Sequence, residues 1–514
     1  MVARIMAMHS ALLSFCSRLS SATAFLLFAC LGLLGPQESQ GASNKLGFHD
    51  SEFSSTAPSD DGFAAASDPA TDSGAEPDWD RSFKTKIPSD VKFGVLLDDS
   101  DYALHAADLF TAASLTKIFT AATALKVFGA EYQFATEVTW KKIDAGTISS
   151  LRILGNGDPS WKSSTLMEIA KRLREKGVRR IIGGVTALAK DERWNQFSYP
   201  PGWNPVYQRE CYASLAHAFN INENCATLAI TSLHQSHWIE TGVGTSVELK
   251  LRPGRSTSLR VERSGSSYMI SGTFKGLAHL QLPIHDTAKW VEGALRSALR
   301  AQGVAFENRE ITDAEKANAS SESLTHLSIK LSEILKRFLK DSICFYGDAL
   351  VQDLGSLSKN GPNDLRAAGL EEIARFNQET NGHPDELIFF DGGGLSTQNK
   401  TSARAVFSAL ENFKKQLWFP DFWNALSIAG KDGTLKDRMK ETAAQNRLRA
   451  KTGTLIGFYH LAGYVPVMNA AKEITAYRSF VILGESTEGE ARKGLIRGRQ
   501  NQAGAALSRW ILQN

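Results

Sequence analysis

The pattern of apolar residues predicts alternating strands and helices near both ends of the chain. Residues 91–99, VKFGVLLDD, form a short and mostly apolar run, which is typical of a buried strand. A helix is predicted from about Ser114 to Gly129, because apolar residues recur at intervals of three and four and the glycine then ends the pattern. Later in the chain, residues 447–467 and 477–485 are predicted to pair as strands, and the C-terminal residues to form a closing helix.

The middle of the chain has a different pattern, with short strand signals predominating between residues 136 and 275. Three helical stretches are predicted within or beside it, at residues 166–176, 284–304 and 324–354. Mixed ends around a strand-rich middle predict an α/β (α+β) domain that carries a large insertion. We place the domain at residues 83–130 and 325–514 and the inserted region at 131–324.

Composition narrows the classes of protein. The chain has 514 residues, of which 42% are hydrophobic and 22% charged, so it is long enough to bury a large core. The 58 basic and 55 acidic residues nearly cancel, which gives no reason to expect nucleic-acid binding. The length and the balanced composition also exclude a disulfide-stapled mini-protein, a collagen, a coiled coil and a mainly disordered chain.

The N-terminal residues are predicted to be an export signal followed by a linker. Residues 22–34 form an apolar run that is too short to span a bilayer, and the polar stretch after it suits cleavage near Ala42. We therefore assign residues 1–42 to a signal peptide and expect an exported, periplasmic or other extracytoplasmic protein. Residues 43–82 are rich in acidic, serine and alanine residues and are predicted to be a flexible linker.

Two alternatives for the signal stay open. The apolar run could remain uncleaved as a membrane anchor and give peripheral membrane association. Cys30 could instead be lipidated, but Phe28 stands two residues before it, where a small residue would be expected, and apolar residues continue after it.

Three cysteines lie beyond the signal. Export implies an oxidising compartment, in which Cys211 and Cys225 could form a disulfide and Cys344 would be left unpaired. Two buried free thiols at positions 211 and 225 are the alternative.

The first candidate chemistry is the motif Ser114-Leu-Thr-Lys117, at the predicted start of a helix. The spacing puts both side chains on one face. A base within hydrogen-bond reach activates a serine hydroxyl as a nucleophile, and a lysine can be that base when its amine is neutral. Alone the motif is weak, since the same pattern recurs in a predicted loop at Ser356-Leu-Ser-Lys359 and most such patterns are ordinary helix starts.

The second motif, Lys451-Thr452-Gly453-Thr454, is predicted on a strand. Its lysine and Thr452 could bind a substrate carboxylate, and Gly453 would leave room for the substrate backbone. The Thr454 amide could join the Ser114 amide in an oxyanion hole. The lysine ammonium would also favour a neutral amine on a neighbouring lysine. A turn at the edge of a strand is the alternative for this motif.

The third motif is Ser342-Ile343-Cys344, in a predicted helical region. Its serine hydroxyl could relay a proton between nucleophile, base and leaving group. Taken alone, it is more simply a buried helix start with a core cysteine. The order of the three motifs along the chain, however, is a signature of serine penicillin-binding proteins and β-lactamases.

The wider sequence resembles the D-alanyl-D-alanine carboxypeptidase/endopeptidase family, the class C low-molecular-mass penicillin-binding proteins. The resemblance runs from about residue 88 to the end of the chain. The segments that carry it are AASLTKIFTAA around Ser114, GNGDPS at 155–160, Trp194 with Pro201-Gly202-Trp203, Asn222-Glu223-Asn224, DGGGLSTQNKTS at 391–402, GKDGTL at 430–435 and KTGTLIGFYHLAGY at 451–464.

This resemblance implies a fold, a reaction and partners. It implies a penicillin-binding transpeptidase/β-lactamase-like domain, an inserted region divided into two extra domains, and a disulfide between Cys211 and Cys225. Ser114 would attack a terminal D-Ala-D-Ala bond in peptidoglycan peptides with Lys117 as base, and water would then release the acyl group. The same steps would cut a D-Ala crosslink. β-Lactam antibiotics would acylate Ser114 as inhibitors, and no metal or organic cofactor would be needed.

Three positions depart from the family pattern or extend it. Relatives have Asn where this chain has Cys344, and a thiol is a weak hydrogen-bond donor and acceptor, so activity is expected to be reduced, retuned or lost. Relatives have Ser where this chain has Gly393, and less effect is expected there. Asp191 is a candidate for the pocket acid that some relatives use to bind a diamino side chain, with a solvated surface acid as the alternative.

An exported serine DD-peptidase is therefore the favoured function. The alternative is a peptidoglycan-binding or scaffold protein of the same fold, impaired in catalysis by Cys344. A β-lactamase is disfavoured, because the chain is far longer than needed and no E-x-x-L-N element stands where it could supply a deacylating glutamate.

Overall fold

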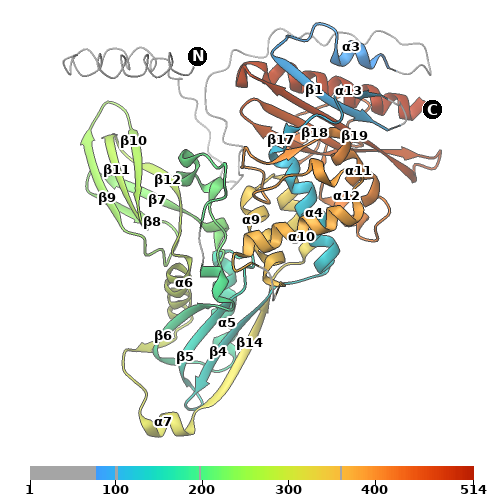
Figure 1. Cartoon of the computed structure of the whole chain (residues 1–514). Coiled ribbons are helices and arrows are strands. Elements are labelled where there is room, and N and C mark those ends of the chain that lie inside the picture. The colour runs from blue at the N-terminus through green and yellow to red at the C-terminus, as the bar shows by residue number, and fades with distance from the viewer. Residues whose placement is uncertain (1–76, 99–101, 196–197, 359–361, 514) are drawn as a thin grey trace. The chain divides into compact units, whose positions relative to one another are not determined.

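The computed structural model describes residues 77–98, 102–195, 198–358 and 362–513, all of which belong to one compact unit of the chain (Figure 1). The predicted signal peptide, most of the predicted linker and Lys359 lie outside these residues. Among the helices that the structure describes, none is long and apolar enough to cross a membrane.

The end of the predicted linker is a short helix. Helix α3 spans Trp79–Phe83, within the residues 43–82 that were predicted to be flexible. Asp78 caps this helix by accepting a hydrogen bond from the Arg81 amide, and the rings of Trp79 and Phe83 are buried. The linker prediction is therefore wrong for these last residues, because burial of two aromatic rings holds them in place.

A six-stranded antiparallel sheet is built from both ends of the chain. Its strand order is β16-β17-β18-β19-β1-β2, so the first long strand pairs with the last. The strands are β1 (Val91–Leu97), β2 (Ala103–Leu104), β16 (Ser427–Ile428), β17 (Arg449–Leu455), β18 (Phe458–Met468) and β19 (Ile474–Ser486). The strands predicted from the apolar pattern are confirmed, and the predicted C-terminal helix is α13 (Lys493–Gln513).

Both faces of this sheet are covered, because successive side chains of a strand point to opposite sides. On one face Leu461 packs with residues of α13, which lies along the sheet in Figure 1. On the other face Ala462 packs with residues of α11 (Ala403–Phe413) and α12 (Phe419–Ala425). Burial on both sides explains why β18 is apolar almost throughout.

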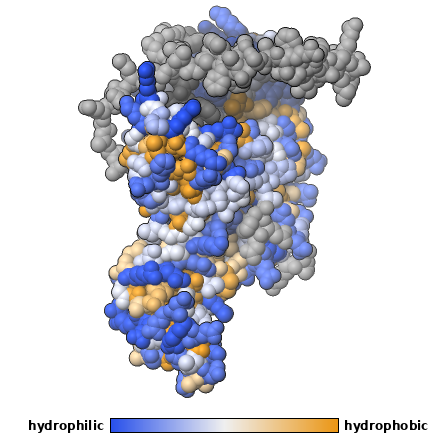
Figure 2. All heavy atoms as spheres, turned by 90° about the vertical axis from the view of Figure 1, so that its left-hand side faces the viewer, coloured by the Kyte–Doolittle hydropathy of each residue, from blue (hydrophilic) through white to orange (hydrophobic). Residues whose placement is uncertain are grey.

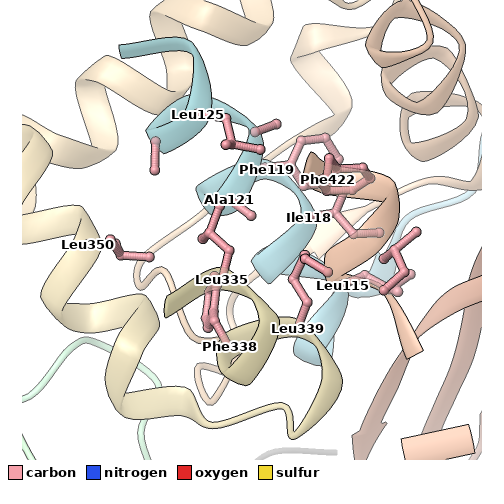
Figure 3. Close-up of a cluster of buried hydrophobic side chains, with 14 of the residues drawn as sticks. Leu115, Ile118, Phe119, Ala121, Leu125, Leu335, Phe338, Leu339, Leu350 and Phe422 are labelled. Carbon is pink, nitrogen blue, oxygen red and sulfur yellow. The ribbon is translucent and has the colours of Figure 1, made fainter. Parts of the chain in front are cut away.

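A helical layer packs on the second face, around the helix predicted near Ser114. Its elements are η1 (Ala113–Leu115), α4 (Thr116–Phe128), α8 (Leu331–Lys340), α9 (Cys344–Ser356) and α10 (Leu365–Thr380). Residues 116–125 of α4 are all buried, so this helix runs through the core and is enclosed on every side. Figure 3 shows Phe119 of α4 beside Phe422 of α12, while Ala121 of the same helix lies on the side of Leu335 of α8.

The region 324–354, predicted to be helical throughout, differs from this prediction in two places. Its first residues belong to strand β14 (Ser320–Leu327). The chain also leaves the helical conformation between α8 and α9, where Ser342 has a φ of +58°. Apolar residues recur at helical spacing on both sides of this turn, so hydrophobic periodicity does not reveal it.

The inserted region forms sheets of its own. The first has the order β13-β6-β5-β4-β14. Its remaining strands are β4 (Ala135–Lys142), β5 (Thr147–Gly155), β6 (Arg180–Ala189) and β13 (Ala305–Glu307). Helices α5 (Ser163–Glu175) and α6 (Thr287–Ala301) share a hydrophobic core with this sheet, and α7 (Asp313–Asn318) precedes β14.

A second group of strands stands between β6 and α6 in the chain. It forms two three-stranded sheets, β12-β7-β8 and β10-β11-β9, which share one core. The strands are β7 (Cys225–Ser232), β8 (Gln235–Trp238), β9 (Val247–Pro253), β10 (Ser258–Ser264), β11 (Ser267–Phe274) and β12 (Ala278–Pro283). Figure 2 faces this part of the chain and shows hydrophobic side chains at its surface among hydrophilic ones.

A disulfide joins Cys211 to Cys225, as the resemblance implied. It ties the short helix η4 (Cys211–Ala213) to the first residue of β7. In the part of the chain that the structure describes, none of the sheets of the inserted region takes a strand from outside residues 135–327. The division of this region into two domains stays a prediction.

Candidate active site

Ser114 lies where a tight turn leads into α4. It is the middle residue of η1, and its side chain is 8% exposed. The preceding residue, Ala113, has a φ of +46°, in the left-handed region that is unfavourable for a residue with a side chain. Gly394 permits this turn, since a Cβ at that position would lie 2.0 Å from the Ala113 carbonyl oxygen. The turn places the serine at the N-terminal end of a buried helix, where the helix dipole favours a negative charge.

Lys117 is completely buried one turn further along α4. Its Nζ lies 3.0 Å from Ser114 Oγ and 3.3 Å from Cys344 Sγ. It also donates a hydrogen bond to the carbonyl oxygen of Gly393. A lysine amine beside a serine hydroxyl is placed to accept the hydroxyl proton. The structure therefore brings the two residues of the first motif together.

Lys451 and Ser342 form a second pair. Lys451 is completely buried on β17, and its Nζ lies 2.8 Å from Ser342 Oγ. The positive φ of Ser342 belongs to the turn between α8 and α9, and Cys344 follows as the first residue of α9. The two pairs are connected through this turn, because Ser342 contacts Lys451 and Cys344 contacts Lys117.

The other residues of the lysine motif are spread along β17. Thr452 Oγ1 donates to the Thr434 hydroxyl at 2.8 Å, in η7 (Gly433–Leu435). A Cβ on Gly453 would come within 2.8 Å of the His460 ring on the adjacent strand, so packing requires glycine there. The Thr454 side chain is exposed.

His460 supports β17 and was missed by sequence reasoning. It is buried in β18, and its Nε2 lies 2.7 Å from the Thr111 carbonyl oxygen, while its Nδ1 lies 3.3 Å from the Gly484 amide. A carbonyl acceptor on one side and an amide donor on the other require a neutral imidazole protonated on Nε2. Burial lowers the pKa of His460 to about 4, in agreement with this neutral form. In the sequence it stands out as a histidine within an apolar strand.

The segment DGGGLS, residues 391–396, holds Gly393 against the lysine amine. Asp391 is fully buried, and its carboxylate accepts a hydrogen bond from the Trp203 indole at 2.6 Å and from the Ser396 amide at 2.7 Å. Trp203 belongs to the inserted region, which therefore helps to shape this loop. The sequence analysis predicted little effect from the departure at Gly393 and missed its carbonyl group, which any residue type would supply.

Cys344 carries a partly exposed free thiol at the start of α9. It packs beside a small hydrophobic cluster made of Trp203, Ala213, Leu215 and Leu395, with Tyr199 and Tyr207 at its edge. Most of these residues come from the inserted region. Cys344 therefore lies between the Lys117 amine and this hydrophobic cluster, which comes mainly from the inserted region.

Asp191 is not brought to the other predicted residues. Its carboxylate forms an ion pair with Arg193 at 2.7 Å, and this guanidinium lowers the pKa of Asp191. Among the residues described, Asp191 makes no hydrogen bond or ion pair with Ser114, Lys117 or Lys451. Its charge is already balanced by Arg193, which favours the alternative of a surface acid.

The fold is that of a penicillin-binding protein. The chain is similar to the crystal structure of penicillin-binding protein 4 (dacB) from Haemophilus influenzae, with a TM-score of 0.65 and 20% identity over 83% of this chain and 98% of that chain. The same protein complexed with a β-lactam gives a TM-score of 0.61, also at 20% identity, over 81% of this chain and 96% of that chain.

Residues 98–499 match the D-Ala-D-Ala carboxypeptidase 3 (S13) family, and the chain belongs to this family. The chain is 28% identical over 389 residues to a D-alanyl-D-alanine carboxypeptidase of Actinomadura sp., covering 70% of this chain and 69% of the relative. It is 23% identical over 398 residues to penicillin-sensitive carboxypeptidase A of Dictyostelium discoideum, covering 71% and 76%. Family membership confirms the resemblance and assigns the chain to the peptidoglycan DD-peptidases as a functional class.

Proposed function

We propose that this chain is an exported serine DD-peptidase that removes terminal D-Ala from peptidoglycan peptides, or cuts their D-Ala crosslinks, through an acyl-serine intermediate. The observation that carries the proposal is the pairing of two lysines with two serines, at 3.0 Å for Lys117 and Ser114 and 2.8 Å for Lys451 and Ser342. The family and the names of the carboxypeptidase relatives support the substrate. The predicted signal peptide supports export.

In the acylation step, Ser114 Oγ forms a bond to the carbonyl carbon of the penultimate D-Ala while its proton passes to Lys117 Nζ. The carbonyl oxygen becomes an oxyanion, which the amides of Ser114 and Thr454 would stabilise. As the intermediate collapses, the C–N bond breaks and the departing amine takes up the proton that Lys117 had accepted, relayed by Ser342. Water then attacks the ester, so that its hydroxyl group completes the carboxyl group of the shortened peptide and its other proton returns to Ser114 Oγ.

Lys451 and Thr452 would hold the C-terminal carboxylate of the substrate. An ammonium group attracts this carboxylate, and a hydroxyl donates a charge-assisted hydrogen bond to it. Ser342 lies beside Lys451, so the leaving D-Ala would be bound next to the group that returns its proton. Binding and proton transfer would then act on the same end of the peptide.

A fluorescent penicillin tests the proposal, because opening of the β-lactam ring by Ser114 would leave a covalent label. The purified full chain should be labelled, and Ser114→Ala should not be. Ser356→Ala, which alters the serine of the second Ser-x-x-Lys sequence, should be labelled like the wild type. Release of D-Ala from a peptide ending in D-Ala-D-Ala should follow the same pattern. An unlabelled wild type would contradict the proposal.

The second candidate is a peptidoglycan-binding protein without turnover. The observation that favours it is Cys344, whose sulfur lies 3.3 Å from Lys117 where relatives have an amide. Binding of the D-Ala-D-Ala peptide with equal affinity by the wild type and Ser114→Ala, and without D-Ala release, would support this candidate. Measurable release by the wild type would reject it.

A further inference from the structure

We infer that Glu223 of the inserted region is a positioning residue for the turn that carries Ser342, an inference that rests on the proposed peptidase function. Glu223 lies in η5 (Asn222–Asn224) and is 2% exposed. Its φ is +60°, and Asn222 and Asn224 beside it are left-handed as well. A glutamate adopts this conformation only where its surroundings hold it there. The backbone strain at Glu223 therefore indicates that its side chain is held in one fixed position.

One oxygen of the Glu223 carboxylate, Oε1, is shared by three groups. It accepts hydrogen bonds from Lys162 Nζ at 2.9 Å and from the Tyr346 hydroxyl at 3.2 Å, and it lies 3.1 Å from Arg337 Nη2. Lys162 stands at the N-terminal end of α5, within the inserted region. Arg337 lies in the last turn of α8 and Tyr346 in the first turn of α9. The carboxylate thus joins the inserted region to both helices.

The two helix ends that Glu223 joins flank the turn at residues 341–343. Ser342, in this turn, contacts Lys451, and Cys344, just after it, contacts Lys117. A group that fixes the end of α8 relative to the start of α9 therefore fixes both of these contacts. A displacement of about 1 Å at a reacting centre can lower a rate about 10²-fold, so this support is expected to matter for catalysis.

We expect Glu223 to act mainly by holding the first turn of α9 in position, and less by balancing the charges of Lys162 and Arg337. The side chains of Lys162 and Arg337 are 36% and 35% exposed, so water can solvate both cations if the carboxylate is removed. Arg337 also has a second carboxylate, Asp341, at 4.0 Å. The Tyr346 hydroxyl is buried, and it would lose its acceptor. Removal of Glu223 therefore releases the first turn of α9 in particular.

The test compares Glu223→Ala and Glu223→Gln with a control, Glu322→Ala, which breaks an ion pair to Lys142 elsewhere in the inserted region. The rate constant for acylation by a fluorescent penicillin should fall by about 10²-fold in Glu223→Ala. Glu223→Gln should lose much less, because its amide oxygen can still accept from Tyr346. Glu322→Ala should acylate like the wild type. A purely structural role would lower the melting temperature and leave the acylation rate of the folded molecules unchanged.

A second readout follows the turn without catalysis. The alkylation rate of Cys344 by iodoacetamide, measured on its peptide by mass spectrometry, should rise several-fold in Glu223→Ala. Unchanged acylation and alkylation in this variant, or an equal loss in Glu322→Ala, would overturn the inference. If the wild type is not acylated, the proposed function fails and the alkylation rate alone decides, a changed rate supporting the positioning role and an unchanged rate rejecting it. If Glu223→Ala does not fold, Tyr346→Phe takes its place with the same readouts and the same expected directions.

Discussion

Lys117 meets the sulfur of Cys344 at the position where the family pattern is expected to place a side-chain amide. The sulfur of Cys344 is 3.3 Å from the lysine amine, so the departure from the family pattern lies at the reacting groups themselves. The Gly393 carbonyl oxygen is a further acceptor for the same amine. A carbonyl group can orient the lysine, but it cannot donate a hydrogen bond to a substrate, as an asparagine amide does.

Cys344→Asn is therefore expected to raise the rate constant for acylation. Restoring one oriented donor at a reaction centre is expected to give a gain of about 10- to 100-fold, since losing one costs about 10²–10³. The time course of labelling by a fluorescent penicillin measures it. Cys344→Ser is the matched control, because its hydroxyl is too short to reach the substrate and should give a smaller gain. An asparagine variant that is no faster than the wild type would mean that this chain no longer depends on the missing amide.

Gly393→Ser would restore the family residue at the second departure, yet it is expected to slow acylation. A Cβ at position 393 would lie 2.7 Å from the Cys344 carbonyl oxygen, which is backbone and cannot swing aside. The loop or the start of α9 would have to shift, and both contact the Lys117 amine. Labelling kinetics measure the effect, with the melting temperature as a check on folding. If Gly393→Ser were acylated as fast as the wild type, the loop would be able to shift at little cost in free energy.

At the scale of elements, the sequence predicts what local spacing determines. The helix around Ser114 and the strand of Lys451 follow from apolar periodicity, and the contact between Ser114 and Lys117 follows from a spacing of three residues on a helix. The turn at Ser342 does not follow, because its left-handed conformation is held by contacts such as that with Lys451, 109 residues away. The Gly393 carbonyl is 276 residues from Lys117 and is a backbone group, so no residue type marks it in the sequence.

Helix α9 also carries a buried carboxylate with an unusual environment. Asp353 is 2% exposed, and in the part of the chain that the structure describes neither of its oxygens has a hydrogen-bond partner. Burial, and then the charge of Asp158, raise the pKa of Asp353 well above its usual value. A carboxyl group with a raised pKa stabilises the fold when it is protonated, and this contribution is lost as the pH rises through the pKa of the folded state.

Asp353→Asn, which resembles the protonated form at every pH, should therefore increase the free energy of unfolding at pH 8. The gain should shrink at pH 5, because the raised pKa of Asp353 makes protonation of the wild-type carboxyl group more favourable there than at pH 8. Urea unfolding at the two pH values measures the difference. Asp348→Asn on the same helix is the control, because Asp348 is paired with Arg366 at 2.8 Å and its replacement should destabilise at both. A gain of equal size at both pH values would contradict the assignment.

At the scale of the whole molecule, the inserted region takes part in building the site. Trp203 holds the Asp391 loop, Glu223 joins α8 to α9, and the Ala216 amide donates to Asp348 of α9 at 3.1 Å. Each contact ends on an element that touches Ser114, Lys117 or Ser342. Since all of them use buried polar groups, the inserted region and the catalytic elements are expected to unfold together.

Three buried histidines make the stability of the molecule depend on pH. Burial lowers the pKa of His217 and His460 to about 4 and that of His285 to about 3. In the unfolded chain these imidazoles have a pKa near 6.5. Between pH 6.5 and pH 4 the unfolded state therefore binds protons that the folded state does not bind. Stability due to these groups is therefore present above pH 6.5 and is lost as the pH falls. Asp158 and Asp353 oppose this, because burial raises the pKa of Asp158 to about 6 and that of Asp353 well above its usual value, so the folded state gains these protons first.

The histidines should prevail, because a pKa lowered by burial in this way corresponds to about 3 kcal/mol for each imidazole, and three of them act against two buried carboxyl groups, Asp158 and Asp353. The free energy of unfolding should be lower at pH 4.5 than at pH 7.5, as measured by urea unfolding of the wild type. His460→Gln, which is neutral at both pH values, should reduce this difference, whereas replacement of the exposed His234 should leave it unchanged. Equal stability of the wild type at the two pH values would mean that these imidazoles accept protons within the folded chain. The packing of His460 against the strand of Lys451 would then have to be less tight than its contact with the Thr111 carbonyl oxygen implies.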